Sequence, residues 1–377
     1  MAGDLNLARY RAQFDSIEGW FDFEAGLLFA AYAQLLDGAA AHGDCLEIGV
    51  LRGKSAVLLA GMRGAGGSLY AIDLFEQLPE DAVRYGGADA ESVFLQTMDR
   101  FYAERSFLRV LKRDSRTVSP HEIGSRVRFC HIDGGHTAAE VYSDLRLAAA
   151  VLLPGGLLAL DDVFNAGYPG VAEGVFRFCF EQRGTFKPLA VGFNKLILQR
   201  LPASGDLHER LTGAFPLLPH RPAQFLGTPI RLYDGDLTAF FDLDCSTARC
   251  LAPRTPIVYG AELAPAPAQL TCPAGAASTL QVGVRNCSTF AFQRWVGLSY
   301  HLLADTGETL RWDNARQYFW SPLAVGKERT LAMPFAAPDT PGRYRLQLDL
   351  IWEGFAWFSW LDLPPVEVEL LVTTPGT

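Results

Sequence analysis

The sequence lacks the features that mark membrane-spanning and secreted proteins. No uncharged apolar run approaches the length of about 20 residues that a transmembrane helix needs. Residues Met1–Leu7 have neither the basic nor the apolar segment of a signal peptide. The seven cysteines are odd in number, scattered and without zinc-ligand spacing. We therefore expect buried thiols, a reducing cytoplasmic location and no metal–thiolate site.

Positive charge is in the minority. The chain has 33 Lys and Arg against 42 Asp and Glu, which gives a formal net charge of −9 at pH 7. An acidic balance of this kind argues against nucleic acid as a partner. Internal repeats and low-complexity tracts are also absent. What is present is 377 residues that are 49% hydrophobic, enough for two or three domains with sizeable cores.

Helix-like and strand-like patterns alternate up to about residue 200. The predicted helices are Phe23–Leu36, Ser55–Ala60, Ala90–Tyr102, Thr137–Leu152 and Val171–Gln182. The predicted strands are Asp44–Ile48, Ser68–Ile72, Leu108–Leu111, Val127–Ile132, Gly156–Leu160 and Lys195–Leu198. This alternation predicts an α/β domain with a Rossmann-like, doubly wound sheet that is mostly parallel, and ligands at the carboxyl ends of its strands.

The pattern changes after residue 200. Residues 201–265 are rich in proline and glycine, and we expect a connecting region there. Residues 266–377 read as short alternating runs broken by turns, which predicts an all-β antiparallel sandwich. Most aromatic residues of this part fit a sandwich core. Those of Trp312–Trp320 are interleaved with polar residues and are candidates for sugar stacking or domain docking.

A glycine-rich turn follows the first predicted strand, at Glu47, Gly49, Gly53 and Ser55. The glycines permit positive φ and close approach of a ligand, and Ser55 could cap the next helix or bond a carboxylate. The interval between the two glycines is one residue short of a phosphate-binding P-loop. The turn alone predicts a nucleotide-like ligand, with an ordinary tight strand–helix turn as the alternative.

Two further polar positions follow the next strands. Asp73 ends the second strand about 20 residues after the glycine turn, a position that suits ribose hydroxyls. A helix-capping aspartate is the alternative. Asp114 and Ser115 close the third strand and could reach the adenine side of the same ligand.

Three carboxylates, Asp133, Asp161 and Asp162, stand at the tips of two further strands. Their negative charges would repel one another unless a cation neutralises them, and oxygen ligands suit a hard divalent ion such as Mg²⁺. His136 follows Asp133 by three residues and could deprotonate a hydroxyl. A capping or supporting histidine is the alternative.

Four motifs in this order resemble the macrocin O-methyltransferase type of class I S-adenosylmethionine-dependent enzymes, which is related to the cephalosporin hydroxylase group. The motifs are Leu46–Ala56, Asp73–Pro79, Ile132–His136 and Leu153–Asp162. The resemblance ends near Arg200. The strands beyond it look like the immunoglobulin-like sandwiches appended to bacterial glycan-processing proteins.

The resemblance implies roles for these residues toward the cofactor, the metal and the proton. Toward S-adenosylmethionine it implies Glu47, Gly49 and Ser55 on the methionine part, Asp73 on the ribose, Asp114 and Ser115 at the adenine, and Trp20 in a lid segment. Gly53 and Asp133 complete the cofactor-binding set. It implies Asp133, Asp161 and Asp162 as ligands of a divalent metal, and His136 as the base.

We therefore expect a Mg²⁺-assisted O-methyltransferase that acts on a sugar hydroxyl of a glycan or glycosylated natural product. His136 or Asp133 would take the proton, and catalysis would consist mainly of positioning, because the cofactor carries the reactive group. One alternative is a non-sugar acceptor such as a phenol or carboxylate, with the sandwich as a dimerisation module. Another is an inactive glycan-binding or scaffold protein. A homo-oligomer is left open.

Overall fold

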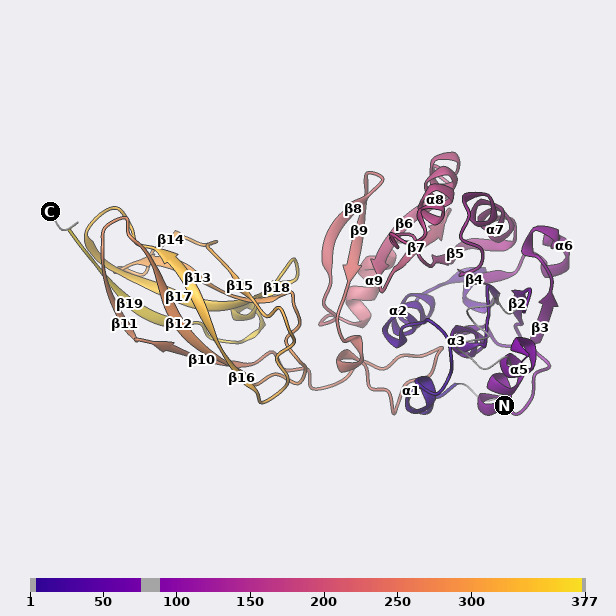
Figure 1. Ribbon diagram of the computed structural model, residues 1–377, viewed down its shortest axis with the longest axis horizontal. Coiled ribbons are helices and arrows are strands. Elements are labelled where there is room, and N and C mark those ends of the chain that lie inside the picture. Colours follow the sequence, from indigo (N-terminus) through magenta and orange to yellow (C-terminus); the bar gives the residue numbers. More distant parts are fainter. Residues whose placement is uncertain (1–4, 76–88, 375–377) are drawn as a thin grey trace. The chain divides into compact units, whose positions relative to one another are not determined.

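The chain forms two compact units in a computed structural model that describes residues 5–75 and 89–374 (Figure 1). The first unit comprises residues 1–218 and 222–254, and the second residues 219–221 and 255–377. The motif Asp73–Pro79 is thus described only as far as Phe75. Within the described ranges no helix is both long enough and apolar enough to span a membrane.

The first unit is built on a mixed sheet of nine strands in the order β3-β2-β1-β4-β5-β7-β6-β9-β8. The strands are β1 (Asp44–Ile48), β2 (Leu69–Asp73), β3 (Leu108–Lys112), β4 (Val127–Ile132), β5 (Leu152–Leu160), β6 (Phe186–Gly192), β7 (Lys195–Arg200), β8 (Arg221–Phe225) and β9 (Thr228–Tyr233). β1 to β5 pair in parallel, and β7 is antiparallel to both β5 and β6. The predicted Rossmann-like α/β fold is confirmed.

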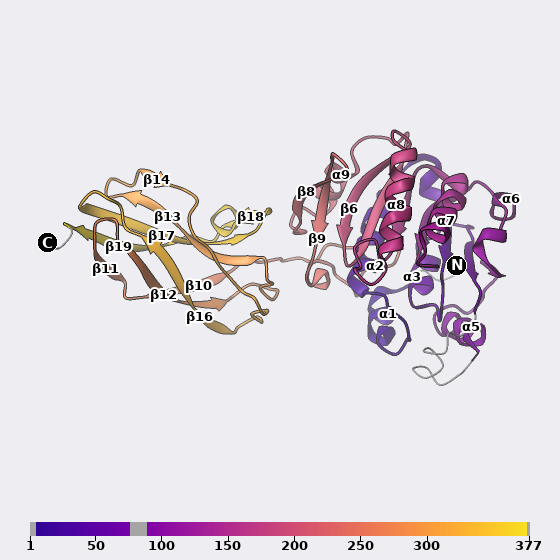
Figure 2. The same ribbon diagram turned by 45° about the horizontal axis from the view of Figure 1, so that its top comes forward.

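Helices cover both faces of this sheet (Figures 1 and 2). They are α1 (Leu7–Phe14), α2 (Phe23–Ala33), α3 (Lys54–Met62), α5 (Ala90–Phe101), α6 (Pro120–Ile123), α7 (Ala138–Val151), α8 (Pro169–Glu181) and α9 (Leu207–Ala214), with short 3-10 turns η1 (Gly38–His42), η2 (Ser115–Thr117) and η3 (Leu237–Phe240).

Strand β4 shows why the sheet is covered on both sides. Every one of its residues is buried, which is typical of a central parallel strand. Phe129 packs its ring 5.1 Å from that of Phe29 in α2, whereas the adjacent Cys130 joins the apolar cluster that includes Leu145 of α7 and Val175 of α8. Successive side chains of a strand point to opposite faces, so β4 contributes to two apolar layers.

The region expected to connect two domains adds structure to the first unit. Residues 201–254 contain α9, β8, β9 and η3, and β9 pairs in parallel with β6. The Tyr32 hydroxyl of α2 lies 3.2 Å from that of Tyr233. These elements are short, and β8 carries a proline, which an edge strand tolerates. Short pieces of this kind give little periodicity, which is why the sequence suggested a linker.

The second unit consists mainly of strands. One sheet has the order β10-β12-β16 and the other β11-β19-β17-β13-β14, with β15 beside β13 and β18 beside β17. The strands are β10 (Ala261–Ala266), β11 (Gln269–Pro273), β12 (Ala277–Asn286), β13 (Val296–Ala304), β14 (Thr309–Arg311), β15 (Gln317–Tyr318), β16 (Glu328–Ala336), β17 (Gly342–Trp352), β18 (Ala356–Trp357) and β19 (Val366–Thr373), and η4 covers Phe358–Leu361.

Whereas β13 is buried continuously from Val296 to His301, alternate residues are buried in β12, β16 and β19 of the second unit. In β12 these include Leu280, Val282 and Val284, and in β19 Val368 and Leu370. Such a pattern indicates that each sheet buries one face. The pairing is antiparallel except that β11 runs parallel to β19. The region is therefore strand-rich as expected, and its immunoglobulin-like character stays a prediction.

Candidate active site

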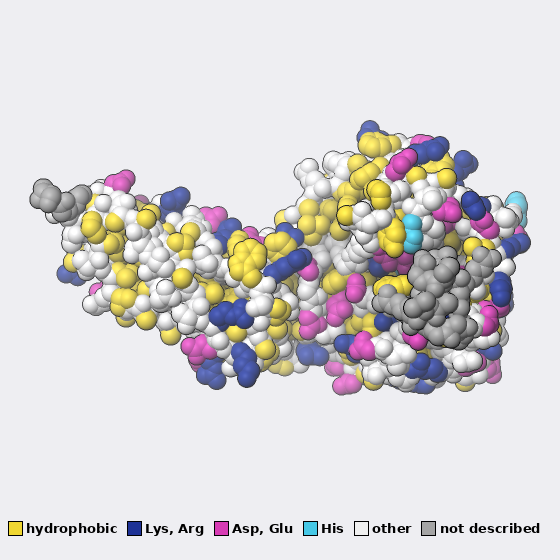
Figure 3. All heavy atoms as spheres, in the orientation of Figure 1, with side chains coloured by type: hydrophobic (Ala, Val, Ile, Leu, Met, Phe, Trp, Pro, Cys, Tyr) yellow, Lys and Arg dark blue, Asp and Glu magenta, His cyan; other side chains and the backbone are white. Residues whose placement is uncertain are grey.

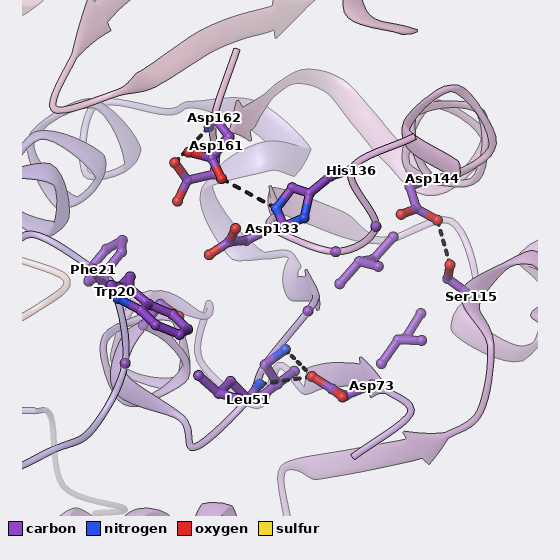
Figure 4. A pocket seen from close by; sticks show the side chains of 18 of the residues that line it. Trp20, Phe21, Leu51, Asp73, Ser115, Asp133, His136, Asp144, Asp161 and Asp162 are labelled. Carbon is purple, nitrogen blue, oxygen red and sulfur yellow. Dashed lines mark hydrogen bonds and ion pairs between the residues drawn. The ribbon is translucent and has the colours of Figure 1, made fainter. Parts of the chain in front are cut away.

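A cavity of about 1010 Å³ opens at the carboxyl ends of the parallel strands (Figure 4). Its lining combines the turn after β1, the ends of β2, β4 and β5, the segment after β3, the loop before α2, and the turn between β6 and β7. On the face drawn in Figure 3, Lys and Arg side chains are scattered among Asp and Glu rather than gathered into one basic surface.

The glycine turn is shaped by the neighbouring strand. Gly49 has φ +84°, and a Cβ there would lie 1.9 Å from the carbonyl oxygen of Asp133. Gly53, also at φ +84°, is the N-cap of α3, so Ser55 lies in the first turn of that helix and is not its cap. Ser55 and Gly49 line the cavity. The glycine at 49 is required by the backbone that follows β4 as well as by any ligand.

Asp73 holds this turn in place. Its Oδ2 accepts hydrogen bonds from the backbone N–H groups of Val50 and Leu51 at 2.6 and 2.8 Å (Figure 4). Its Oδ1 accepts one from the N–H of Phe75 at 2.6 Å. A carboxylate has about four lone-pair sites, so Asp73 retains acceptor capacity toward the cavity that it lines.

Glu47 is fully buried with His131. Glu47 Oε1 lies 2.8 Å from His131 Nδ1, and both side chains are 0% exposed. Glu47 Oε2 and His131 Nε2 have no hydrogen-bond partner among the described residues. A buried carboxylate oxygen without a donor is costly, which makes it a candidate acceptor for a ligand group. Neither Glu47 nor Gly53 belongs to the cavity lining.

The segment after β3 contains the expected pair, Asp114 and Ser115, and contacts Asp144, which the sequence did not indicate. The Arg116 guanidinium bonds Asp114 at 2.9 Å through Nε and holds the pKa of that carboxyl below its usual range. Ser115 Oγ donates to Oδ1 of Asp144 in α7 at 2.5 Å (Figure 4). Burial raises the pKa of Asp144 to about 6. The sequence signal that could have identified Asp144 is an acidic residue at a core-facing position of a helix.

The three predicted carboxylates do meet. Potential metal-ligand atoms of Asp133, His136 and Asp162 all lie within 4.8 Å of one another, as do those of His131, Asp133 and Asp161. Enclosure in the protein, and then the negative charge of Asp161, raise the pKa of Asp133 well above its usual range. Two carboxylates this close resist ionising together.

His136 is fixed by two contacts at the cavity. Its Nε2 lies 3.3 Å from Asp162 Oδ2 (Figure 4). Its ring stacks on that of Tyr168 at 3.9 Å and 7°. The bond to His136 is the main reason why the pKa of Asp162 falls to about 2. Trp20, 56% exposed, lines the cavity from the loop before α2.

Lys195 and Asn194 also enter the site, and the sequence did not indicate either. Lys195 Nζ lies 2.5 Å from Asp161 Oδ2, and Asn194 Nδ2 donates to Asp161 Oδ1 at 3.4 Å and to Asp162 Oδ1. Both come from the β6–β7 hairpin, where Phe193 and Asn194 have φ 52° and 61°. Positive φ at two central positions is the geometry of a two-residue hairpin turn.

The residues present fit the groups that the resemblance implies. Carboxylate oxygens are hard donors that suit Mg²⁺, and Asp133 and Asp162 offer them beside the cavity. The unpartnered Glu47 Oε2 and the free acceptor capacity of Asp73 suit the amino and ribose hydroxyl donors of S-adenosylmethionine.

Comparison with known proteins relates part of the first unit to methyltransferase domains. Residues 46–163 match the family described as a methyltransferase domain. A search of curated proteins found no match. The matched residues include most of β1 and all of β2 to β5, and the cavity opens at the carboxyl ends of these strands.

Among solved structures, an O-methyltransferase from Bacillus cereus in complex with S-adenosylhomocysteine is 17% identical, with a TM-score of 0.38, over 52% of this chain and 90% of its own. The N-methyltransferase NodS from Bradyrhizobium japonicum is 14% identical, with a TM-score of 0.34, over 52% and 100%. The MycE methyltransferase of the mycinamycin biosynthetic pathway, in complex with Mg and S-adenosylhomocysteine, is 14% identical, with a TM-score of 0.35, over 53% and 54%. Likenesses this low say nothing of the reaction or acceptor of this chain. Residues 46–163 thus match a methyltransferase domain and lie within a sheet of Rossmann-like α/β order.

Proposed function

We propose that this protein transfers a methyl group from S-adenosylmethionine to a hydroxyl of a sugar, in a glycan or glycosylated natural product, assisted by Mg²⁺ or another hard divalent cation. The observation that carries the proposal is that one cavity is lined by Gly49, Ser55 and Asp73 as well as by the carboxylates and His136. The methyltransferase-domain match supports the reaction class.

The β1–β3 side of the cavity would bind the cofactor. Asp73 would accept from the ribose hydroxyls with the lone pairs that its backbone bonds leave over. Asp114 and Ser115 would flank the adenine, and Gly49, Gly53 and Ser55 would shape the site of the methionine part. Glu47 Oε2, buried and unpartnered among the described residues, is the acceptor that a cofactor ammonium would satisfy.

The β4–β5 side would bind the acceptor. S-adenosylmethionine would supply the electrophilic methyl group, and a divalent cation would supply positive charge beside the acceptor oxygen. Asp133, Asp161 and Asp162 are the carboxylates that surround this position. His136 would take the acceptor proton, and Asp162, whose Oδ2 lies 3.3 Å from His136 Nε2, would stabilise the protonated ring.

A phenolic acceptor is the second candidate. The stacked pair of His136 and Tyr168 and the exposed Trp20 present flat faces at the cavity. Such faces stack on an aromatic ring as well as on the apolar face of a sugar.

We also propose a cytoplasmic location, and for residues 266–377 an immunoglobulin-like sandwich that binds glycan or pairs two copies of the chain.

Two measurements test the proposal. Calorimetry with S-adenosylhomocysteine should show binding, and its absence would favour an inactive scaffold protein. Transfer of labelled methyl from S-adenosylmethionine should then be screened against sugars, glycosides and phenols, with and without EDTA. We expect glycosides to be methylated and EDTA to abolish the reaction. Undiminished transfer in EDTA would exclude the metal, and labelling of phenols alone would establish the second candidate.

A further inference from the structure

The carboxylate cluster contains its own cation. Lys195 Nζ bonds Asp161 Oδ2 at 2.5 Å, and the two side chains are 4% and 6% exposed. The ammonium also lies 5.5 Å from the centre of the Phe21 ring. Because both partners are buried, separating them would leave an uncompensated charge in the protein interior. This ion pair is therefore a fixed part of the site.

Both carboxylate oxygens of Asp161 already face donors, and one of these donors is the positively charged ammonium of Lys195. Its Oδ2 faces Lys195, and its Oδ1 accepts from the backbone N–H of Asp162 at 2.7 Å and from Asn194 at 3.4 Å. Asp133 differs, since among the described residues no hydrogen bond reaches its carboxylate, which lines the cavity. Asp162 also has three partners, His136 at Oδ2 and the side-chain amides of Asn165 and Asn194 at Oδ1, but none of them is a lysine or arginine. Ligand atoms of Asp133, His136 and Asp162 lie within 4.8 Å of one another.

We propose that Lys195 is the resident cation of this cluster and withholds Asp161 from a divalent ion, so that Asp133 and Asp162 are the carboxylates left to hold one. The presence of such an ion rests on the proposed function, whereas the Lys195–Asp161 pair does not. The assignment departs from the three-carboxylate site that the resemblance implies. The divalent ion would therefore face three carboxylates and one ammonium, whose charges sum to −2.

A charge-conserving double variant separates this arrangement from a three-carboxylate site. Asp161→Asn with Lys195→Met removes one charge of each sign and leaves the net charge of the cluster unchanged. Lys195→Met alone adds a net negative charge and frees Asp161. Asp162→Asn removes a proposed ligand. Lys187→Met is the matched control, because Lys187 pairs with Asp206 at 3.8 Å and is absent from the cavity lining.

Binding of Mn²⁺ to the full-length protein, followed by the loss of the free-ion EPR signal, gives the readout without an acceptor. We expect the double variant and Lys187→Met to bind within about threefold of the wild type. Lys195→Met should bind at least about tenfold more tightly, because removing a nearby unit positive charge is worth at least that factor at an effective dielectric constant of about 20. Asp162→Asn should bind about tenfold more weakly or worse.

A tenfold loss in the double variant would overturn the proposal, and so would unchanged binding in Lys195→Met or no Mn²⁺ binding by any protein. Thermal unfolding checks that each variant folds, and if Lys195→Met does not, the double variant and Asp162→Asn still decide. Calorimetry with S-adenosylhomocysteine on the same samples keeps the two proposals apart. Cofactor binding together with Mn²⁺ binding that lacks this pattern contradicts only this inference, and the Mn²⁺ pattern without cofactor binding contradicts only the proposed function.

Discussion

At the scale of single residues, the backbone that follows one strand determines which residue can stand at the end of a neighbouring strand. Gly49 faces the carbonyl oxygen of Asp133 at a distance that excludes any Cβ. The sequence suggested that this glycine makes room for a ligand. In the structure it also lets the end of β1 approach the residue that follows β4. The position of Asp133 at the cavity therefore depends on Gly49.

We predict that Gly49→Ala lowers the free energy of unfolding by more than about 3 kcal/mol, because it combines an unfavourable positive φ with displacement of backbone. Gly66 is the control: its φ is +72°, and a Cβ there would meet nothing within 4 Å. Gly66→Ala should cost about 1 to 2 kcal/mol. Urea denaturation of both variants measures the difference. Equal losses would mean that the approach to Asp133 is not tight.

Asp144 predicts a pH dependence of stability. Its pKa is raised from 3.8 to about 6 in the folded protein, so the folded state binds the proton more tightly than the unfolded state. The free energy of unfolding should therefore decrease as the pH rises from about 4 to about 6, by up to about 3 kcal/mol from this group. Asp144→Asn should remove that decrease and be the more stable protein at neutral pH.

Urea denaturation between pH 4 and pH 7 checks this expectation as the difference between wild type and variant. Asp99→Asn serves as the control, since Asp99 is more than half exposed and pairs with Arg105 at the surface. Its curve should run parallel to that of the wild type. A difference between wild type and Asp144→Asn that does not change with pH would contradict the raised pKa.

At the scale of elements, the hairpin of β6 and β7 places two polar side chains in the site. Asn194 combines a positive φ with bonds to the carboxylates of Asp161 and Asp162. We predict that Asn194→Gly keeps the stability within about 1 kcal/mol, because glycine adopts this φ freely. It should nevertheless weaken Mn²⁺ binding or methyl transfer through less ordered carboxylates.

Asn194→Val should instead destabilise the protein by more than about 1 kcal/mol, because a β-branched residue strongly disfavours positive φ. Thermal unfolding of the two variants gives the comparison. If Asn194→Gly proved as unstable as Asn194→Val, the bonds to the carboxylates would outweigh the turn conformation.

This hairpin also shows what the sequence can and cannot predict. The predicted strands correspond to β1, β2, β3, β4, β5 and β7. Of these, β1, β4 and β7 are almost entirely buried, and buried strands give continuous apolar runs with clear ends. The glycine turn and the strand-end carboxylates followed from the same pattern. Strand β6 and the turn at Asn194 were missed, and with them the pairing of Lys195 and Asp161, since a contact between residues 34 positions apart leaves no local signal.

At the scale of the whole molecule, the limit of the first unit lies beyond the predicted residue 200. Helix α9 and strands β8 and β9 belong to it, and the backbone N–H of Ala248 donates to the carbonyl of Leu5 at 3.1 Å. The region before the second unit thus completes the first. The prediction of 201–265 as a connecting region did not anticipate these contacts, because they are made to residues more than 200 positions earlier.

We predict that residues 1–254 form a stable fragment that binds S-adenosylhomocysteine with the affinity of the full chain. A fragment of residues 1–200 should aggregate or unfold at a lower temperature, because it leaves β6 without β9 and Tyr32 without Tyr233. Expression of both fragments, followed by thermal unfolding and calorimetry, tests this. Equal stability of the two would return the boundary to residue 200.

The bonds between the two ends of the first unit have a consequence for biosynthesis. Leu5 and Leu7 hydrogen-bond Ala248 and Ser246, and Gly61 lies where a Cβ would touch both Leu5 and Ala248. This seam cannot form until the ribosome has released nearly 250 residues. Closure of such a sequence-distant contact carries a large entropic penalty and is slow. We therefore expect the first unit to complete its folding late in translation. Its N-terminal residues can form these bonds only after the segment that contains Ser246 and Ala248 has been synthesised.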